Sequence, residues 1–145
     1  MEKELLNTFD KELLLKDLCA RLPYGIKFLR ESWNFETDQE LSVIEVLEDI
    51  DKDGYINNTK VYKVEDIKPY LFPLSNMTEE QKESSPFEPS LLNAFINGHI
   101  SLFEDEELNI DDLNRLYDWF NKNHFDYRGL IEKSLALDAT GLNIY

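Results

Sequence analysis

The chain has 145 residues, of which 42% are hydrophobic and 12% aromatic, and its formal net charge is −15. This apolar content is enough for one hydrophobic core and exceeds that of disordered acidic chains, so we expect one folded domain, residues 1–145. The negative charge repels nucleic-acid phosphates and anionic membrane surfaces, which disfavours direct binding to either.

The negative charge is concentrated in two segments. Residues 31–53 carry a net charge of −8 and residues 79–121 carry −9, while the rest of the chain is nearly neutral. Such segments indicate either a solvated face that aids solubility or a surface that attracts a basic protein, including one that itself binds nucleic acid. The candidate partner-binding residues are Glu104, Asp105, Glu106, Glu107, Asp111 and Asp112.

Neither a secretory leader nor a membrane span is recognisable at the start of the chain. The N-terminus is acidic and its apolar run, residues 13–15, has only three residues, so we expect a cytoplasmic protein. The single cysteine, Cys19, falls among helical apolar positions, which predicts a buried, reduced thiol; a reactive thiol is the alternative.

The first predicted element is a helix over residues 2–22. Leu5, Phe9 and Leu13 recur four residues apart, and further leucines continue the stripe. Pro23 ends the helix because its ring clashes with the preceding turn and it has no N–H to donate.

A small antiparallel meander of three or four strands is predicted next, within residues 24–74. Residues 25–30, 41–47 and 61–64 are rich in β-branched, aromatic and other apolar side chains, which favours strands. Residues 51–54 are typical of a turn between the second and third strands, because Asp and Gly tolerate a positive φ.

The segment 67–74 closes this part of the chain and contains Pro69 and Pro73. A proline cannot donate to a strand ladder, so the segment is predicted to be an extended connector or an edge and not a central strand. Its remaining residues are mostly apolar or aromatic, which indicates that it is buried.

The remainder, residues 78–145, is predicted to be mainly helical. Thr78 and Gln81 have the spacing of a capping box, which predicts a short helix, and two further helices are expected over residues 90–98 and 109–121. The overall prediction is an α+β fold: an N-terminal helix, a small antiparallel sheet and a helical C-terminal part.

A last helix is predicted from residue 127 to residue 137, with Asp126 as its cap. Residues 138–141 are expected to turn the chain into a short C-terminal tail.

An aspartate-rich segment, residues 49–60, matches the first half of an EF-hand loop. Asp49, Asp51 and Asp53 occupy positions 1, 3 and 5, and Gly54 occupies position 6. Position 12, which should be a bidentate Glu, is Lys60, and the flanks are predicted strands. The segment therefore favours an acidic turn, with a calcium-binding module or a weak ion site at the three aspartates as the alternative.

His124, Asp126 and Arg128 are spaced two residues apart, so an extended backbone would place them on one side. They would then supply a base, an orienting carboxylate and an anion-holding guanidinium, as a small enzyme requires. The competing interpretation makes Asp126 a helix cap, His124 a packed linker residue and Arg128 the ion-pair partner of Asp126.

Other signals of catalysis or cofactor binding are missing from the sequence. It contains no glycine-rich phosphate loop, no Cys/His cluster and no nucleophile elbow, so we expect no cofactor and favour a non-enzymatic role. Trp33 and Trp119 are expected in the core, because an acidic protein is a poor platform for stacking bases.

Three unusual blocks occur in order along the chain: residues 16–25 (KDLCARLPYG), residues 67–81 (IKPYLFPLS followed by MTEEQ) and residues 123–133 (NHFDYRGLIEK). Together they resemble a family of short hypothetical proteins of gut bacteria and their phages and prophages. The family has no known function, so the resemblance implies only a phage-related accessory protein. The two acidic segments lie between or beside these blocks, which suits a stable scaffold with changeable surfaces.

The sequence therefore favours a non-enzymatic accessory or interaction protein that presents acidic surfaces to a basic protein partner. One specific version is a nucleic-acid mimic, which would occupy the nucleic-acid site of a defence or replication protein. The small enzyme and the calcium-binding module remain alternatives.

Overall fold

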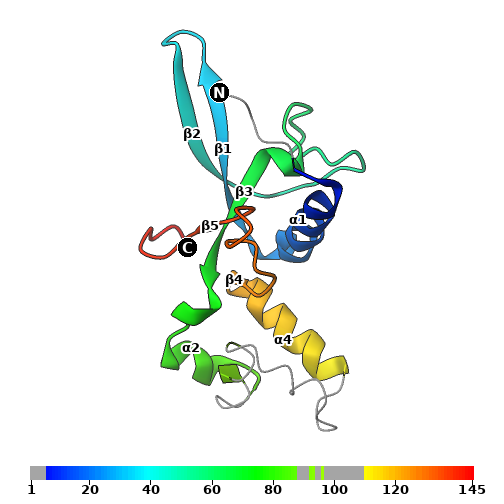
Figure 1. Ribbon diagram of the computed structural model, residues 1–145, viewed down its shortest axis with the longest axis vertical. Helices are drawn as coiled ribbons and strands as arrows, with labels where there is room; N and C mark the ends of the chain where they lie inside the picture. Colours follow the sequence, from blue (N-terminus) through cyan, green and yellow to red (C-terminus); the bar gives the residue numbers. More distant parts are fainter. Residues whose placement is uncertain (1–5, 88–91, 94–95, 97–109) are drawn as a thin grey trace.

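The protein has an α+β fold in which one long helix packs on a five-stranded sheet (Figure 1). The structure, a computed structural model, describes residues 6–87, 92–93, 96 and 110–145. The sheet has the strand order β2-β1-β3-β4, and β5 also pairs with β3. The predicted α+β class and the N-terminal helix are confirmed, but the sheet is mixed and not purely antiparallel.

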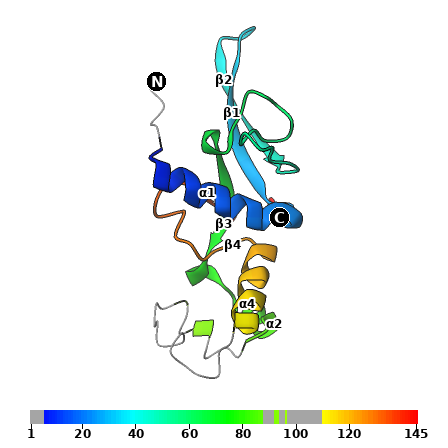
Figure 2. The same cartoon turned by 90° about the vertical axis from the view of Figure 1, so that its right-hand side faces the viewer.

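Helix α1 spans Thr8–Arg21 and crosses the sheet on one face (Figure 2). Asn7 caps it, because its side-chain oxygen accepts a hydrogen bond from the Asp10 N–H at 2.7 Å. Leu14 and Leu18 are fully buried by the sheet. The predicted buried thiol is wrong: Cys19 is exposed, because it follows Leu18 and so falls outside the buried stripe of the helix.

Strands β1 (Lys27–Asn34) and β2 (Gln39–Val46) form an antiparallel hairpin. Both predicted strands therefore exist, but β1 starts two residues later and ends four residues later than predicted, and β2 starts two residues earlier and ends one residue earlier. Asn34 closes the turn, since its side-chain oxygen accepts from the Glu36 N–H at 3.0 Å, and Asp38 adopts a positive φ of 55°.

Strand β3 (Ile67–Pro73) lies in the middle of the sheet, so the prediction of a connector or edge is wrong. It pairs with β1 through residues 67–69 and with β4 and β5 through residues 70–73. Each proline falls where a ladder ends: Pro69 is the last residue paired with β1, and Pro73 is the last residue of the strand. The missing N–H groups are therefore not needed at these positions.

Strands β4 (Phe125–Asp126) and β5 (Leu137–Asp138) are both parallel to β3 and only two residues long. The Phe72 N–H donates to the His124 carbonyl at 2.8 Å, and the Ala139 N–H donates to the Leu71 carbonyl at 2.8 Å. The Leu71 carbonyl and the Phe72 N–H belong to one trans peptide and point in opposite directions, so these bonds attach the C-terminal part of the chain to both sides of β3.

The third predicted strand, residues 61–64, is wrong. The chain there makes only an isolated bridge between Tyr55 and Lys63 and then enters a 3₁₀ turn, Val64–Asp66. Local bonds replace the ladder: the Thr59 hydroxyl accepts from the Tyr62 N–H at 3.0 Å, and the Asp66 carboxylate accepts from the Lys63 N–H at 2.9 Å. The turn at residues 51–54 is present, but it lies in a long loop and does not join two strands of the sheet.

Two of the predicted helices in the second half of the chain are confirmed. Helix α2 (Glu79–Ser84) starts with the expected capping box of Thr78 and Gln81, and helix α4 (Ile110–Lys122) matches the 109–121 prediction. The predicted helix over residues 90–98 lies mostly outside the described residues. A short 3₁₀ turn, Leu74–Asn76, joins β3 to α2.

The predicted last helix, residues 127–137, is wrong, because this segment is a series of turns. Gly129 has a φ of +74° and Ser134 has a φ of +61°, which a right-handed helix does not allow. The part of the chain after Lys122 is therefore not helical. Asp126 still caps backbone groups, as its prediction required, but it caps a turn.

Two hydrophobic clusters form the core of the molecule, whose ribbon is elongated in Figure 1. The first joins α1, the sheet and the long loop, and it includes Leu18, Phe28 and Leu71. The second joins α4 and the end of the sheet, and it includes Phe120 and Phe125, with Trp119 packed against it. Among the described residues, no helix is long and apolar enough to cross a lipid bilayer.

Candidate functional site

The side chains of His124, Asp126 and Arg128 engage three different sets of partners. Both Asp126 carboxylate oxygens accept backbone hydrogen bonds, from Leu130 and Ile131, each at 2.9 Å. A carboxylate held in this way stabilises a turn. It is not positioned to orient the imidazole of His124, which stacks elsewhere.

Arg128 forms an ion pair with Asp17 of α1, at 3.2 Å, and not with Asp126 as predicted. Asp17 also accepts a hydrogen bond from Arg21 at 2.8 Å, and Arg21 donates to the Phe125 carbonyl at 2.7 Å. The side chains of Asp17 and Arg21 are completely buried. This network fastens α1 to the start of β4, so it is a structural element of the fold.

The ring of His124 stacks on Tyr145, with ring centroids 3.8 Å apart and planes inclined by 17°. Burial lowers the pKa of His124 to about 4, and the nearby charges of Arg21 and Lys27 act in the same direction. The imidazole is therefore neutral at physiological pH. His124 is a packed linker residue between α4 and β4, and the three side chains form no catalytic cluster.

Tyr145 fastens the C-terminal tail to the sheet. Its hydroxyl accepts from the Lys27 N–H and donates to the Tyr70 carbonyl, each at 2.8 Å. Burial raises its pKa to about 12, so the hydroxyl keeps its proton at neutral pH.

The aspartate-rich loop is organised around Asp51. Its carboxylate accepts hydrogen bonds from the N–H groups of Asp53 and Tyr55, each at 2.9 Å, and pairs with the Lys60 ammonium at 3.3 Å. The Tyr55 hydrogen bond is the main reason that the pKa of Asp51 is lowered, and Lys60 adds to it. The Lys60 ammonium thus places beside the Asp51 carboxylate the positive charge that a bound calcium ion would otherwise provide.

Asp49 and Asp53 do not complete an ion site with Asp51. Asp53 is exposed, whereas the backbone of Asp49 is bonded to Asn57. In the described part of the chain, no three His, Cys, Asp or Glu side chains are grouped so that they could hold a metal ion.

The two acidic segments do not form one surface where the structure describes them. The first lies on the β1–β2 hairpin and the loop after it, and the described end of the second lies on α2 and α4, at the opposite end of the molecule (Figure 1). Asp111 is exposed in the first turn of α4, and Asp112 pairs with Arg115. Glu104, Asp105, Glu106 and Glu107 lie outside the described residues.

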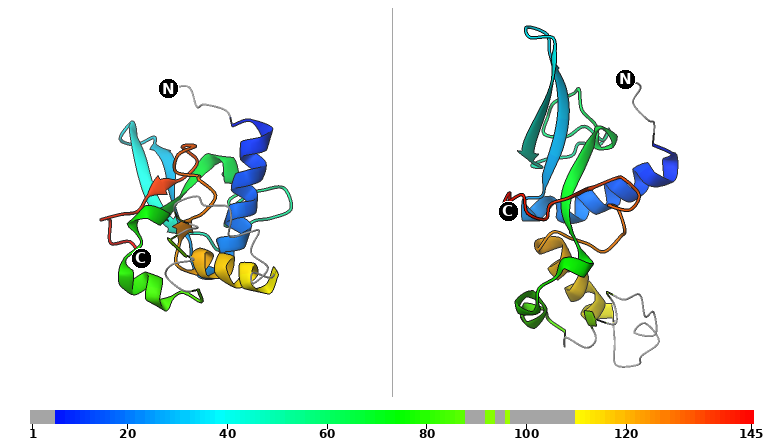
Figure 3. Two further views of the ribbon diagram at one scale, coloured as in Figure 1. Left: turned by 60° about the horizontal axis from the view of Figure 1, so that its bottom comes forward. Right: turned by 60° about the vertical axis from the view of Figure 1, so that its left-hand side comes forward.

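The hairpin projects beyond the rest of the sheet (Figure 3). β1 and β2 are paired over eight positions, but β1 is paired with β3 only over Phe28, Leu29 and Arg30. We call residues 31–42 the outer hairpin. In the described part of the chain no third strand pairs with it, and β2 forms the edge of the sheet, so the outer edge of β2 is unpaired.

The outer hairpin and β2 combine acidic and apolar side chains. The outer hairpin contains four acidic residues and no basic residue, namely Glu31, Glu36, Asp38 and Glu40. Phe35 at the tip is 88% exposed, and Leu41 and Ile44 on β2 are 42% and 46% exposed. An exposed apolar strand beside unopposed acids is typical of a surface that binds another molecule.

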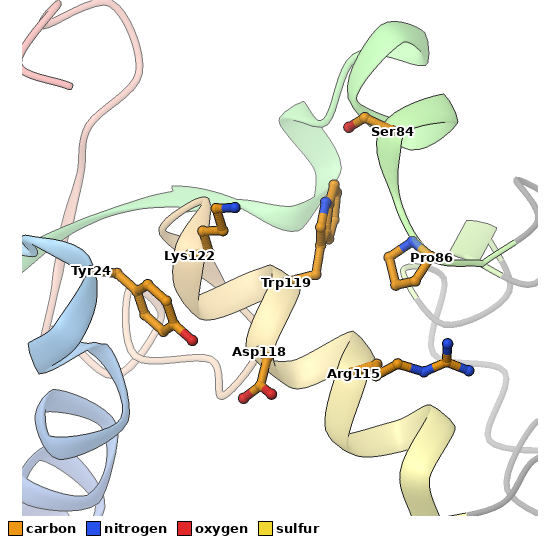
Figure 4. A pocket seen from close by; sticks show the side chains of 7 residues that line it. All are labelled: Tyr24, Ser84, Pro86, Arg115, Asp118, Trp119 and Lys122. Atoms are coloured by element: carbon orange, nitrogen blue, oxygen red, sulfur yellow. The ribbon is translucent and has the colours of Figure 1, made fainter.

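A concave surface, a cleft of about 330 Å³, lies beside α4 (Figure 4). Trp119 forms its wall together with Tyr24 and Pro86, and charged groups stand at its rim. The indole of Trp119 also stacks on Phe125, with centroids 5.6 Å apart, so the tryptophan contributes to the core as predicted.

No known protein family, curated protein or solved structure matches this chain. The candidate site therefore rests on the geometry of the chain itself. Sequence reasoning identified the acidic segment 31–53 but missed that its strands stand away from the body. The available signal was the spacing of Glu40 and Glu45 in β2: residues five apart in a strand lie on opposite faces, so each face of β2 carries a carboxylate and neither face is wholly apolar.

Proposed function

We propose that the protein is a non-enzymatic accessory protein that binds a basic protein partner through its outer hairpin. The observation that carries the proposal is the hairpin's projection from the sheet, with four acids and no bases. A positive segment of the partner would be attracted by this charge, and its apolar side chains would cover Leu41 and Ile44.

The mode of binding that fits this surface is the addition of a strand to the free edge of β2. Edge strands that must stay unpaired usually carry lysine, proline or a bulge. β2 has none of these: it has eight residues, its charges are Glu40 and Glu45, and its ladder with β1 is regular. Main-chain hydrogen bonds would supply affinity, and the acids would select a basic strand.

A second copy of the chain is a poorer occupant of this edge, because two acidic hairpins would repel each other. Resemblance to phage-related proteins fits an accessory role in which the partner is a nucleic-acid-binding protein of the host. In that case the acidic surface acts as a nucleic-acid mimic, and Glu104, Asp105, Glu106 and Glu107 in the second acidic segment are the other candidate residues for it.

The test compares three charge-reversal variants in capture from host-cell extract, followed by affinity measurement with the purified partner. The hairpin variant is Glu36→Lys, Asp38→Lys, Glu40→Lys. The matched control reverses three exposed acids elsewhere, Glu12→Lys, Glu83→Lys, Glu132→Lys, and so changes the net charge equally. The third variant reverses Glu104, Asp105 and Glu106.

The hairpin variant should weaken binding by a factor of about ten or more, which corresponds to about 1.4 kcal/mol. The control variant should bind as the wild type does, and added salt should weaken the wild-type complex. Equal loss of affinity in the hairpin and control variants would show that binding depends only on the total charge of the protein. Loss of binding confined to the third variant would assign the site to the second acidic segment, residues 79–121.

A further inference from the structure

A cavity of about 500 Å³ lies between α1, α4 and the segment after β4. It is separate from the hairpin and opens on a different face of α4 from the cleft in Figure 4. Its volume falls within the range of pockets that hold small molecules. The residues that line it are Lys16, Ala20, Tyr117, Asn121, Tyr127 and Arg128.

The cavity is positively charged within a strongly acidic protein. Lys16 and Arg128 line it, and Arg21 lies behind it with its guanidinium 5.4 Å from the ring of Tyr127. Asp17 pairs with both arginines and so neutralises only part of this charge. Three cations near one carboxylate favour an anionic ligand.

The tyrosine hydroxyls add hydrogen-bond donors. The Tyr127 hydroxyl accepts from Arg128 Nη2 at 2.8 Å, so its own proton is directed to another acceptor. Tyr117 lies beside it, with ring centroids 5.0 Å apart. Burial raises the pKa of Tyr117, which keeps this hydroxyl protonated at neutral pH.

Asn121 provides the complementary group. It is only 4% exposed, and its side-chain oxygen Oδ1 is buried without a hydrogen-bond partner. A buried acceptor without a partner has lost its hydrogen bonds to water and gained none in return, which is unfavourable. A ligand that donates a hydrogen bond to Oδ1 would satisfy this acceptor. The ligand should therefore combine negative oxygens with one hydroxyl group.

We propose that this cavity binds a phosphate group, either as free inorganic phosphate or as the monoester of a small molecule. The phosphate oxygens accept from Lys16 and Arg128, and a protonated P–OH donates to Asn121 Oδ1. The volume of the cavity leaves room for the organic part of an ester. This site does not depend on the function proposed for the hairpin.

Titration calorimetry at pH 6 tests the proposal, because phosphate retains a proton there and sulfate has none. Inorganic phosphate should bind saturably, and sulfate should bind at least about tenfold more weakly. A sugar phosphate is the second probe. Tighter binding of the sugar phosphate would identify an ester as the ligand, and tighter binding of inorganic phosphate would identify the free ion.

Two lysine variants on α1 give a matched comparison. Lys16 is exposed, so Lys16→Gln should leave the fold intact and weaken phosphate binding by a factor of about ten. Lys11 does not line the cavity and pairs with Glu65, so Lys11→Gln should not change the affinity. In an NMR titration, the side-chain amide of Asn121 should shift with phosphate.

Equal affinity for sulfate and phosphate would overturn the proposal, since the donor to Asn121 would then be irrelevant. The same conclusion follows if phosphate gives no heat and no shift at Asn121, or if Lys11→Gln weakens binding as much as Lys16→Gln. None of these outcomes bears on the hairpin, because its acids do not line the cavity.

Discussion

In the group His124, Asp126 and Arg128, which the sequence offers as an alternative catalytic site, the histidine and the arginine make their main contacts with residues far away in the chain. His124 contacts Tyr145, and Arg128 contacts Asp17. In each case the contact comes from another element, so a spacing of two residues could not reveal it. Asp126, in contrast, caps groups within five residues of itself, and its capping role was predictable.

Histidine 124 should make stability depend on pH. Its pKa is about 4 in the folded protein and about 6.5 in the unfolded chain, so the unfolded chain binds more protons between these values. The free energy of unfolding should therefore include the whole contribution of the neutral His124 above pH 6.5. It should fall by at most about 3 kcal/mol as the pH is lowered towards 4.

Urea unfolding at several pH values checks this prediction, with His124→Asn as the comparison. Asparagine tolerates the positive φ of 63° at this position and does not titrate in this range. The carboxylates titrate in both proteins, so the difference between the two curves isolates the histidine. Parallel curves from pH 7 to pH 4 would contradict the assigned pKa.

At the scale of elements, the aspartate-rich loop shows that a carboxylate of an ion-binding motif can bond to groups of the protein itself. Asp51 is bonded to two backbone N–H groups and to Lys60. The loop is also flanked by a strand and a 3₁₀ turn, whereas an EF-hand is flanked by helices.

Calcium chloride at millimolar concentration should therefore give no binding heat with the wild-type protein. Lys60→Gln should also give none, because both backbone bonds to Asp51 remain. The same substitution should raise the pKa of Asp51 towards its ordinary value, which an NMR titration of the carboxyl would measure. A saturable calcium heat in either protein would restore the ion-site alternative.

The elements predicted correctly are those with strong local signals. Helix α4 has apolar residues at helical spacing, and α2 has its capping box. The errors lie where distant pairing decides the structure. Strand β3 is central because β1 and the two short C-terminal strands pair with it. The residue types at positions 67–73 do not indicate which segments of the chain those partners are.

At the scale of the whole molecule, charge and shape are coupled. The net charge of −15 is carried largely by segments that lie at opposite ends of an elongated body where they are described, which keeps like charges apart. The projecting hairpin is the clearest consequence: its four acids are held away from the core, where water solvates them.

Salt should stabilise the folded protein. Raising the ionic strength from 0.01 M to 0.15 M shortens the screening length from about 30 Å to about 8 Å, which weakens repulsion among the acids. We expect the midpoint of thermal unfolding to rise over this range. The variant Glu36→Lys, Asp38→Lys, Glu40→Lys should respond less, because it carries less negative charge. A midpoint independent of salt in the wild type would contradict the argument.

The sequence by itself determined the α+β class, the N-terminal helix, the helix at residues 109–121 and the acidic segment 31–53, because these follow from local spacing, capping and composition. Only the tertiary structure decided that residues 67–73 form the central strand, that the outer hairpin stands free, and that Lys16, Asn121 and Arg128 line one cavity. These features depend on contacts between distant residues, and local preferences do not specify such contacts.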